Sequence, residues 1–211
     1  MIGTGPRPLQ SSPSPPCTAV ILAGGRGTRL GGADKSAVVV GGRTILARQL
    51  ALLGQVTSRV AIVTNDAARF PHAGVPVLVD ETSDAGPLGG LATALAWSDQ
   101  PHCLIVACDM PFLSAAFLQH LVVRAQGADV ALPRTGHGLQ PLCAVWACTV
   151  LPRVRARIEA GRLDVTGLVH EVCAVEIGPE ELAVFDPGHV LLSNVNTPQD
   201  LDAACAWADR E

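Results

Sequence analysis

The sequence predicts a single three-layer α/β domain around a mostly parallel central sheet. Short apolar runs alternate with helical segments of roughly 10–15 residues, and these runs lack the polar alternation of half-exposed strands. The 211 residues suffice for one sizeable domain, and 48% hydrophobic against 16% charged residues provide its core. Sheets of this kind bind ligands beyond the carboxyl ends of their strands, so the residues that follow each strand are the candidates for chemistry.

Each element is placed by its apolar run and by its flanking residues. The predicted strands cover residues 18–23, 59–64, 75–79, 102–108, 129–132, 142–146 and 173–177. The predicted helices cover residues 44–53, 86–97, 114–125, 148–160 and 197–208. Thr44, Ser114 and Thr197 are suitable N-caps for three of these helices, and Gly54 ends the first. Pro87 stands at a permitted first helical position.

Residues 1–17 predict a disordered, proline-rich leader ahead of a domain over 18–211. This leader has no apolar stretch of the kind that a secretory signal contains, so the expected location is the cytoplasm. Seven cysteines, an odd count, fit a reducing compartment, in which they serve as small buried side chains rather than as disulfides.

Composition excludes two classes of partner. The net charge of −4 and an aromatic share of 3% argue against nucleic-acid binding, which needs basic surface and often stacking rings. No apolar run approaches the roughly 20 residues that cross a bilayer, so no membrane span is expected.

The densest functional pattern follows the first strand and reads L-A-G-G-R-G-T-R-L-G-G-A-D-K over residues 22–35. Closely spaced glycines let backbone N–H groups converge on phosphate oxygens, and Arg29 and Lys35 add positive charge. The pattern fails both the dinucleotide-binding G-x-G-x-x-G and the P-loop G-K-[ST]. The residues therefore predict a triphosphate cradle of another kind, with a mobile glycine-rich surface loop as the alternative.

This stretch resembles the nucleotidyltransferase signature L-A-x-G-x-x-x-R-M-G-x-x-K. Its Leu-Ala-Gly-Gly form and closing Asp-Lys resemble the molybdenum cofactor guanylyltransferases, with Leu30 for the usual Met, Gly27 where Ser is common and one residue inserted before Asp34. The resemblance covers residues 18 to about 208, with the motifs in family order. It implies a Rossmann-like nucleotidyltransferase domain that transfers GMP from GTP to the phosphate of molybdopterin, giving the guanine dinucleotide cofactor and pyrophosphate.

Polar residues follow three further strands. Asn65 is either a contact to a base edge or a turn residue, and Asp80 is either a base-binding carboxylate or a polar strand end. Asp109, in D-M-P-F-L, is a Mg²⁺ ligand, an exposed loop residue or a helix cap. The resemblance favours the functional alternative for all three, and implies nucleotide binding by Leu22, Ala23, Gly24, Lys35, Asn65, Asp80 and Asp109.

The resemblance also implies the chemistry. Lys35, Asp109 and Arg29 would be the catalytic residues, Asp109 would hold Mg²⁺, and no catalytic base is required because the substrate phosphate is already a nucleophile. Gln140-Pro141-Leu142 and the segment around Asn194 and Asn196 match the family too. The two asparagines are candidates for contacting the pterin substrate or the metal-bound phosphate, with a helix cap as the alternative for Asn196.

The remaining cysteine and arginine patterns give weaker evidence of a functional site. Cys103/Cys108 and Cys143/Cys148 lack zinc-site spacing, and Arg153, Arg155 and Arg157 suggest a solvated helix face, with a pterin contact as the alternative. A molybdopterin cytidylyltransferase, a sugar-phosphate nucleotidyltransferase and a non-catalytic nucleotide-binding protein stay open. The Leu-Ala-Gly-Gly sequence favours GTP, because cytidylyl relatives usually read Leu-Ala-Ala-Gly. Transient contact with molybdoenzymes or their chaperones fits the implied product.

Overall fold

The computed structural model describes residues 15–24, 37–80 and 82–210 of the chain. Arg29 and Lys35 lie outside these described residues. The described part contains an eight-stranded sheet in the order β10-β7-β9-β6-β1-β4-β5, with β8 paired to β7. Its strands are β1 Cys17–Leu22, β4 Val60–Thr64, β5 Val77–Val79, β6 His102–Ala107, β7 Val130–Thr135, β8 Gly138–Leu139, β9 Cys143–Ala147 and β10 Ala174–Ile177.

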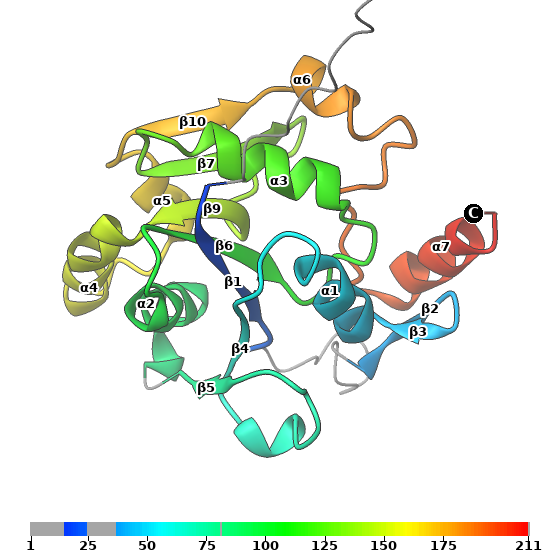
Figure 1. Cartoon of the computed structure of the whole chain (residues 1–211), viewed down its shortest axis with the longest axis horizontal. Helices are drawn as coiled ribbons and strands as arrows, with labels where there is room; N and C mark the ends of the chain where they lie inside the picture. The colour runs from blue at the N-terminus through cyan, green and yellow to red at the C-terminus, as the bar shows by residue number, and fades with distance from the viewer. Residues whose placement is uncertain (1–14, 25–36, 81, 211) are drawn as a thin grey trace, which may run out of the picture.

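All the described helices but α7 (Pro198–Ala208), which packs beside a separate hairpin, cover the two faces of this sheet, which confirms the predicted three-layer α/β fold (Figure 1). The others are α1 Ile45–Leu53, α2 Pro87–Trp97, α3 Ala115–Arg124, α4 Leu151–Glu159, α5 Val165–Val169 and α6 Pro179–Ala183. Single 3₁₀ turns cover Ala67–Arg69, Ser83–Ala85 and Cys148–Val150. None of the helices in the described ranges has both the length and the apolar character that crossing a membrane requires.

The central strand explains why the strands read as unbroken apolar runs. Ala19 and Ile21 of β1 pack in the cluster that contains residues of α1 and α3, whereas Val20 and Leu22 pack in the cluster on the opposite face with α2 and α4. Alternate side chains of a strand point to opposite faces. Since both faces are covered, the four residues from Ala19 to Leu22 are all apolar although they point to opposite faces.

The sheet is mostly parallel, as predicted. β1 pairs in parallel with β4 and β6, β4 with β5, and β7 with β10. β9 and β8 are the exceptions, because β9 runs antiparallel to both of its neighbours, β6 and β7, and β8 runs antiparallel to β7. β1 is flanked by β4 on one side and β6 on the other, so the strand order changes direction there. Ligands of open α/β sheets bind at such a point.

The predicted helix caps are confirmed. The hydroxyl oxygens of Thr44 and Ser114 accept hydrogen bonds from the backbone N–H groups of Ala47 and Phe117. Thr197 accepts one from Asp200, whose carboxylate in turn accepts one from the Thr197 N–H, which forms a capping box. Asn196 is therefore not the cap of α7.

The region beside the sheet holds elements that the sequence pattern did not predict. A short hairpin, β2 Val39–Val40 and β3 Arg43–Thr44, packs against α7 through a small apolar cluster. Val40 and Ile45 lie in this cluster together with Val195 and Ala204. The hairpin strands are two residues long, so their apolar pattern is too short to distinguish from a loop.

Two expectations about polar and cysteine residues need correction. Arg157 is not on a solvated face: it is 5% exposed, and its Nη1 lies 2.6 Å from Glu171 Oε1 while its Nη2 donates to the Asp164 carbonyl. All seven cysteines are free, but only Cys17, Cys103, Cys108 and Cys143 are buried, and Cys173 is exposed. Burial raises the pKa of the Cys103 and Cys143 thiols to about 12, so these two stay protonated at neutral pH.

Candidate active site

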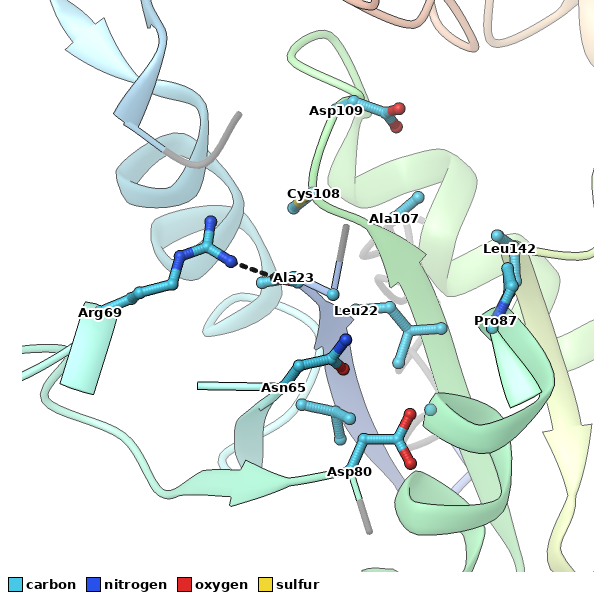
Figure 2. A pocket seen from close by; sticks show the side chains of 14 residues that line it. Leu22, Ala23, Asn65, Arg69, Asp80, Pro87, Ala107, Cys108, Asp109 and Leu142 are labelled. Atoms are coloured by element: carbon cyan, nitrogen blue, oxygen red, sulfur yellow. Dashed lines mark hydrogen bonds between the residues drawn. The ribbon is translucent and has the colours of Figure 1, made fainter. Parts of the chain in front are cut away.

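A cavity of about 340 Å³ lies at the carboxyl ends of β1, β4, β5 and β6, where the strand order changes direction (Figure 2). This volume is within the range of pockets that hold small ligands. The cavity is lined by Leu22, Ala23, Gly24, Val63, Asn65, Arg69, Asp80, Gly86, Pro87, Gly90, Ala107, Cys108, Asp109 and Leu142. Every predicted nucleotide-binding residue within the described ranges is among them.

The end of β1 presents backbone to this cavity. Leu22 and Ala23 are 8% and 2% exposed, and the Ala23 N–H donates to the Val63 carbonyl at 2.8 Å. A Cβ atom on Gly24 would lie 3.2 Å from Asn65 Oδ1, which is tighter than most contacts of this kind. Glycine at this position therefore lets the chain pass close to Asn65.

Asn65 points into the cavity from the end of β4 (Figure 2). The turn that follows is capped by its neighbour, because Asp66 Oδ1 accepts a hydrogen bond from the Ala68 N–H at 3.0 Å. The Asn65 amide is not needed for that turn. Its carbonyl and amino groups are an acceptor and donors suited to a base edge or a ribose.

Asp80 is a buried carboxylate at the end of β5, with an exposed fraction of 6%. Its Oδ1 atom accepts hydrogen bonds from the N–H of Thr82 at 2.9 Å and from the Thr82 hydroxyl at 3.1 Å. The side chain points toward the first turn of α2 (Figure 2). Thr82 thus orients the carboxylate in the cavity wall.

Gly89 allows that first turn to approach Asp80. A Cβ atom there would lie 2.6 Å from the Thr82 carbonyl oxygen and 2.8 Å from Asp80 Oδ2. Gly89→Ala is expected to displace Asp80 or α2, lowering stability by about 1–3 kcal/mol and raising KM for the nucleotide about tenfold. Thermal unfolding and steady-state kinetics measure both effects. Gly178→Ala is the matched control, because nothing lies within 4 Å of its added Cβ, and unchanged kinetics in both variants would contradict the prediction.

Asp109 lies on the loop after β6 and lines the upper part of the cavity as drawn (Figure 2). It is not a helix cap, since Ser114 caps α3. Its backbone carbonyl accepts a hydrogen bond from the Val195 N–H at 2.8 Å. Asp109 thereby joins the loop after β6 to the segment that precedes α7.

Asn194 and Asn196 flank Val195 and line a second cavity of about 720 Å³. Gln140 lines this second cavity, and Leu142, two residues later, lines the first. The walls of the two cavities are linked by the short segment from Gln140 to Leu142 and by the Asp109–Val195 hydrogen bond. The second cavity is also lined by Arg134 of β7, by His137 of the β7–β8 turn and by His189 of the segment before α7.

Sequence reasoning missed Arg69 and Thr82. Arg69 reaches across from the 3₁₀ turn after β4, lines the first cavity and donates from Nη1 to the Ala23 carbonyl at 3.4 Å. Its position depends on the turn over Ala67–Arg69, and the sequence carried no pattern for that turn. Thr82 lies two residues after Asp80, where its hydroxyl could have been recognised as a partner for the carboxylate.

The sequence matches the family model described as the MobA-like NTP transferase domain over residues 19–171. It is 33% identical over 192 residues to a probable molybdenum cofactor guanylyltransferase of Pelotomaculum thermopropionicum, covering 91% of this chain and 93% of that protein. It is 34% identical over 190 residues to a molybdenum cofactor guanylyltransferase of Cereibacter sphaeroides, covering 88% of this chain and 93% of that protein.

Solved structures share the fold. The crystal structure of molybdopterin-guanine dinucleotide biosynthesis protein A from Archaeoglobus fulgidus superposes with a TM-score of 0.79 at 24% identity, covering 92% of this chain and all of that one. A 4-diphosphocytidyl-2C-methyl-D-erythritol synthase from Anaerococcus prevotii gives a TM-score of 0.71 at 12% identity, covering 93% of this chain and 97% of that one. At these identities the likeness concerns the fold alone.

Proposed function

Because the chain belongs to the molybdenum cofactor guanylyltransferase family of MobA-like NTP transferases, we propose that it transfers GMP from GTP to the phosphate of molybdopterin. The products are the molybdopterin guanine dinucleotide cofactor and pyrophosphate. Membership of this family makes the protein a nucleotidyltransferase.

The observation that carries the proposal is the meeting of Asn65, Asp80 and Asp109 around one cavity at the carboxyl edge of the sheet. Asn65 and Asp80 lie at the ends of β4 and β5, on the side where the base is proposed to bind. Asp109 lies at the end of β6, on the side where phosphates are proposed to bind. Leu22, Ala23 and Gly24 lie between these two sides, at the end of β1.

The transfer is a substitution at the α-phosphorus of GTP. An oxygen of the molybdopterin phosphate attacks, a new P–O–P linkage forms, and the bond to the bridging oxygen breaks so that its electron pair leaves with pyrophosphate. A phosphate is already anionic at neutral pH, so no residue has to remove a proton from the nucleophile. The protein contributes alignment and charge neutralisation, for which we propose Lys35, Arg29 and the backbone from Ala23 onward.

Nucleotidyltransferases of this kind generally use a divalent metal, and we propose Mg²⁺ held by Asp109. Within the described ranges, no three His, Cys, Asp or Glu residues form a metal site of their own. The single Asp109 carboxylate suits Mg²⁺, which is commonly held by one or two carboxylates together with substrate phosphates and waters. The ion would offset negative charge on the phosphates.

The second cavity is the proposed place of molybdopterin. Asn194 and Asn196 line it, and the carbonyl and amino groups of their side chains suit the polar edge of a pterin. The linked walls of the two cavities would let the pterin phosphate approach the nucleotide near Asp109.

We also propose a cytoplasmic location and transient contact with molybdoenzymes or their chaperones, which would receive the product.

A nucleotide panel tests this function. Purified protein is incubated with molybdopterin and Mg²⁺ plus GTP, CTP, ATP or UTP, and released pyrophosphate is measured together with the dinucleotide product. We expect kcat/KM for GTP to exceed that for each other nucleotide by at least about 100-fold, as a site that hydrogen-bonds the base can discriminate by this much or more.

Preference for CTP in this panel would favour the cytidylyltransferase alternative. Pyrophosphate release with a sugar phosphate in place of molybdopterin would favour a sugar-phosphate nucleotidyltransferase. Nucleotide binding without pyrophosphate release from any acceptor would favour a non-catalytic binding protein. Each of these results would contradict the proposed GMP transfer.

A further inference from the structure

Gln49 is a polar side chain in the buried face of α1, with an exposed fraction of only 1%. It lies four residues after Ile45 and four before Leu53, and these two apolar neighbours on the same helix face are fully buried. An apolar residue would be expected at such a position. The buried Gln49 amide therefore needs a hydrogen-bond partner inside the protein.

That partner is the loop after β6. Gln49 Nε2 donates to the carbonyl oxygen of Ala107 at 2.7 Å and to the carbonyl oxygen of Met110 at 3.0 Å. The two carbonyl groups stand on either side of Cys108 and Asp109 in the chain. The reverse amide orientation would set Oε1 against the same two oxygens, so the donor assignment is fixed by its surroundings.

Burying the Gln49 amide costs free energy, and packing in the core alone does not explain why the residue is a glutamine. Within the described part of the chain, Oε1 of Gln49 is buried without a hydrogen-bond partner. A buried, half-satisfied amide is less favourable than an apolar side chain of similar volume. Its presence is explained if the two bonds that Nε2 makes serve the loop rather than the core.

The same loop is held from other directions. The Cys108 N–H donates to the Leu22 carbonyl at 3.2 Å, and the Asp109 carbonyl accepts from Val195 at 2.8 Å. Gln49 adds the bonds at the two ends of this short segment, residues 107–110. The backbone that carries the Asp109 side chain is thus fixed by α1, β1 and the segment before α7.

We propose that Gln49 is a positioning residue, which holds the loop over residues 107–110 so that the Asp109 carboxylate faces the phosphate side of the nucleotide cavity. This inference rests on the proposed function, which gives Asp109 its role. Gln49 touches neither substrate nor metal in this scheme. Its effect passes through the backbone at Ala107 and Met110.

The test is Gln49→Met, which keeps the side-chain volume and removes the donor. The Mg²⁺ concentration that gives half-maximal GMP transfer is expected to rise about tenfold, because groups that orient a metal ligand typically change metal affinity by about 10–100-fold. KM for GTP at saturating Mg²⁺ should change less than threefold. Amide hydrogen exchange over residues 108–113 should accelerate at least tenfold, a readout that needs no activity.

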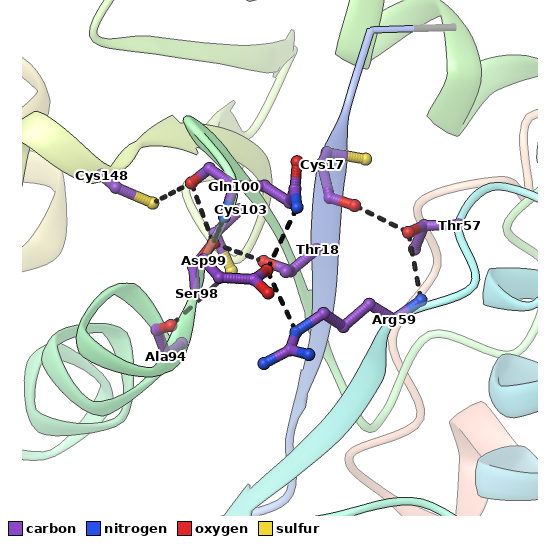
Figure 3. Close-up of polar contacts among 10 residues, drawn as sticks. All are labelled: Cys17, Thr18, Thr57, Arg59, Ala94, Ser98, Asp99, Gln100, Cys103 and Cys148. Atoms are coloured by element: carbon purple, nitrogen blue, oxygen red, sulfur yellow. Dashed lines mark hydrogen bonds and ion pairs between the residues drawn. The ribbon is translucent and has the colours of Figure 1, made fainter.

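The matched control is Thr18→Val, a substitution of another buried polar residue in the core. The Thr18 hydroxyl donates to Ser98 Oγ at 2.8 Å, in a group of polar contacts around the start of β1 (Figure 3). This group lies at the amino ends of β1, β4 and β6, at the edge of the sheet opposite the cavity. The control should lower stability while leaving the Mg²⁺ dependence and exchange over 108–113 as in the unmodified protein.

Faster exchange and a raised Mg²⁺ requirement in Gln49→Met, but not in Thr18→Val, would support the proposal. Wild-type exchange over 108–113 in Gln49→Met, or equal changes in both variants, would overturn it. If the unmodified protein transfers no GMP to molybdopterin, the proposed function fails, and the exchange comparison still decides whether Gln49 holds the loop.

Discussion

Replacing Asp109 or Lys35 by Ala is expected to reduce kcat for GMP transfer by about 1,000-fold, equivalent to roughly 4 kcal/mol. Asp109 is the proposed metal-binding carboxylate, and Lys35 the proposed cation beside the departing pyrophosphate. Each would act on charge that develops in the transition state, so the loss should appear in kcat rather than in KM alone. Pyrophosphate release at saturating GTP, molybdopterin and Mg²⁺ measures it.

Both variants should keep the fold. The bond that Asp109 makes to Val195 uses its backbone carbonyl, which Ala retains. Asp202→Ala, on the exposed face of α7, is the matched control and should have wild-type turnover. Near-normal GMP transfer by both Asp109→Ala and Lys35→Ala would show that these roles are assigned wrongly.

The positions of the site residues could be predicted from the sequence because a parallel sheet brings strand ends together. Asn65, Asp80 and Asp109 are far apart in the chain, yet each directly follows an apolar run. Once the runs are taken as neighbouring parallel strands, their following residues must meet at one edge. The cavity at the ends of β1, β4, β5 and β6 contains all three.

The direction of β9 shows what an apolar run does not encode. Its residues Cys143 and Val145 face one apolar cluster and Ala144 and Trp146 the other, which would hold for either strand direction. The connection length decides instead. Only residues 136–142 separate β7 from β9, too few for the crossover of a dozen or more residues that parallel strands require.

Gln49 and Arg157 were missed for a related reason. Helical periodicity marks which face of a helix is buried, but not which polar group that face serves. Gln49 occupies a core position because its partners are carbonyl groups of a loop about 60 residues away. Arg157 is buried because Glu171 and the Asp164 carbonyl bind it. Such partners are known only once the chain is folded.

Replacing Asp80 by Asn is expected to change nucleotide preference. The Asp80 carboxylate is proposed to accept the N1–H and the exocyclic N–H of guanine. In the variant, the oxygen that accepts from Thr82 N–H and Oγ1 is retained, so the new amino group takes the place of Oδ2. An amino group facing two guanine donors makes no hydrogen bond with them. We expect kcat/KM for GTP to fall about 100-fold, roughly 2.7 kcal/mol.

Activity with xanthosine triphosphate distinguishes a loss of base recognition from general damage to the protein. Xanthine carries a carbonyl in place of the exocyclic amine of guanine, and that oxygen can accept from the Asn amino group. Asp80→Asn should therefore use xanthosine triphosphate better than GTP, while the unmodified protein should prefer GTP. Asp99→Asn, an exposed carboxylate paired with Arg59 on the opposite edge of the sheet, is the matched control and should retain GTP preference. Equal loss of both nucleotides in Asp80→Asn would show that Asp80 supports the cavity wall instead of binding the base.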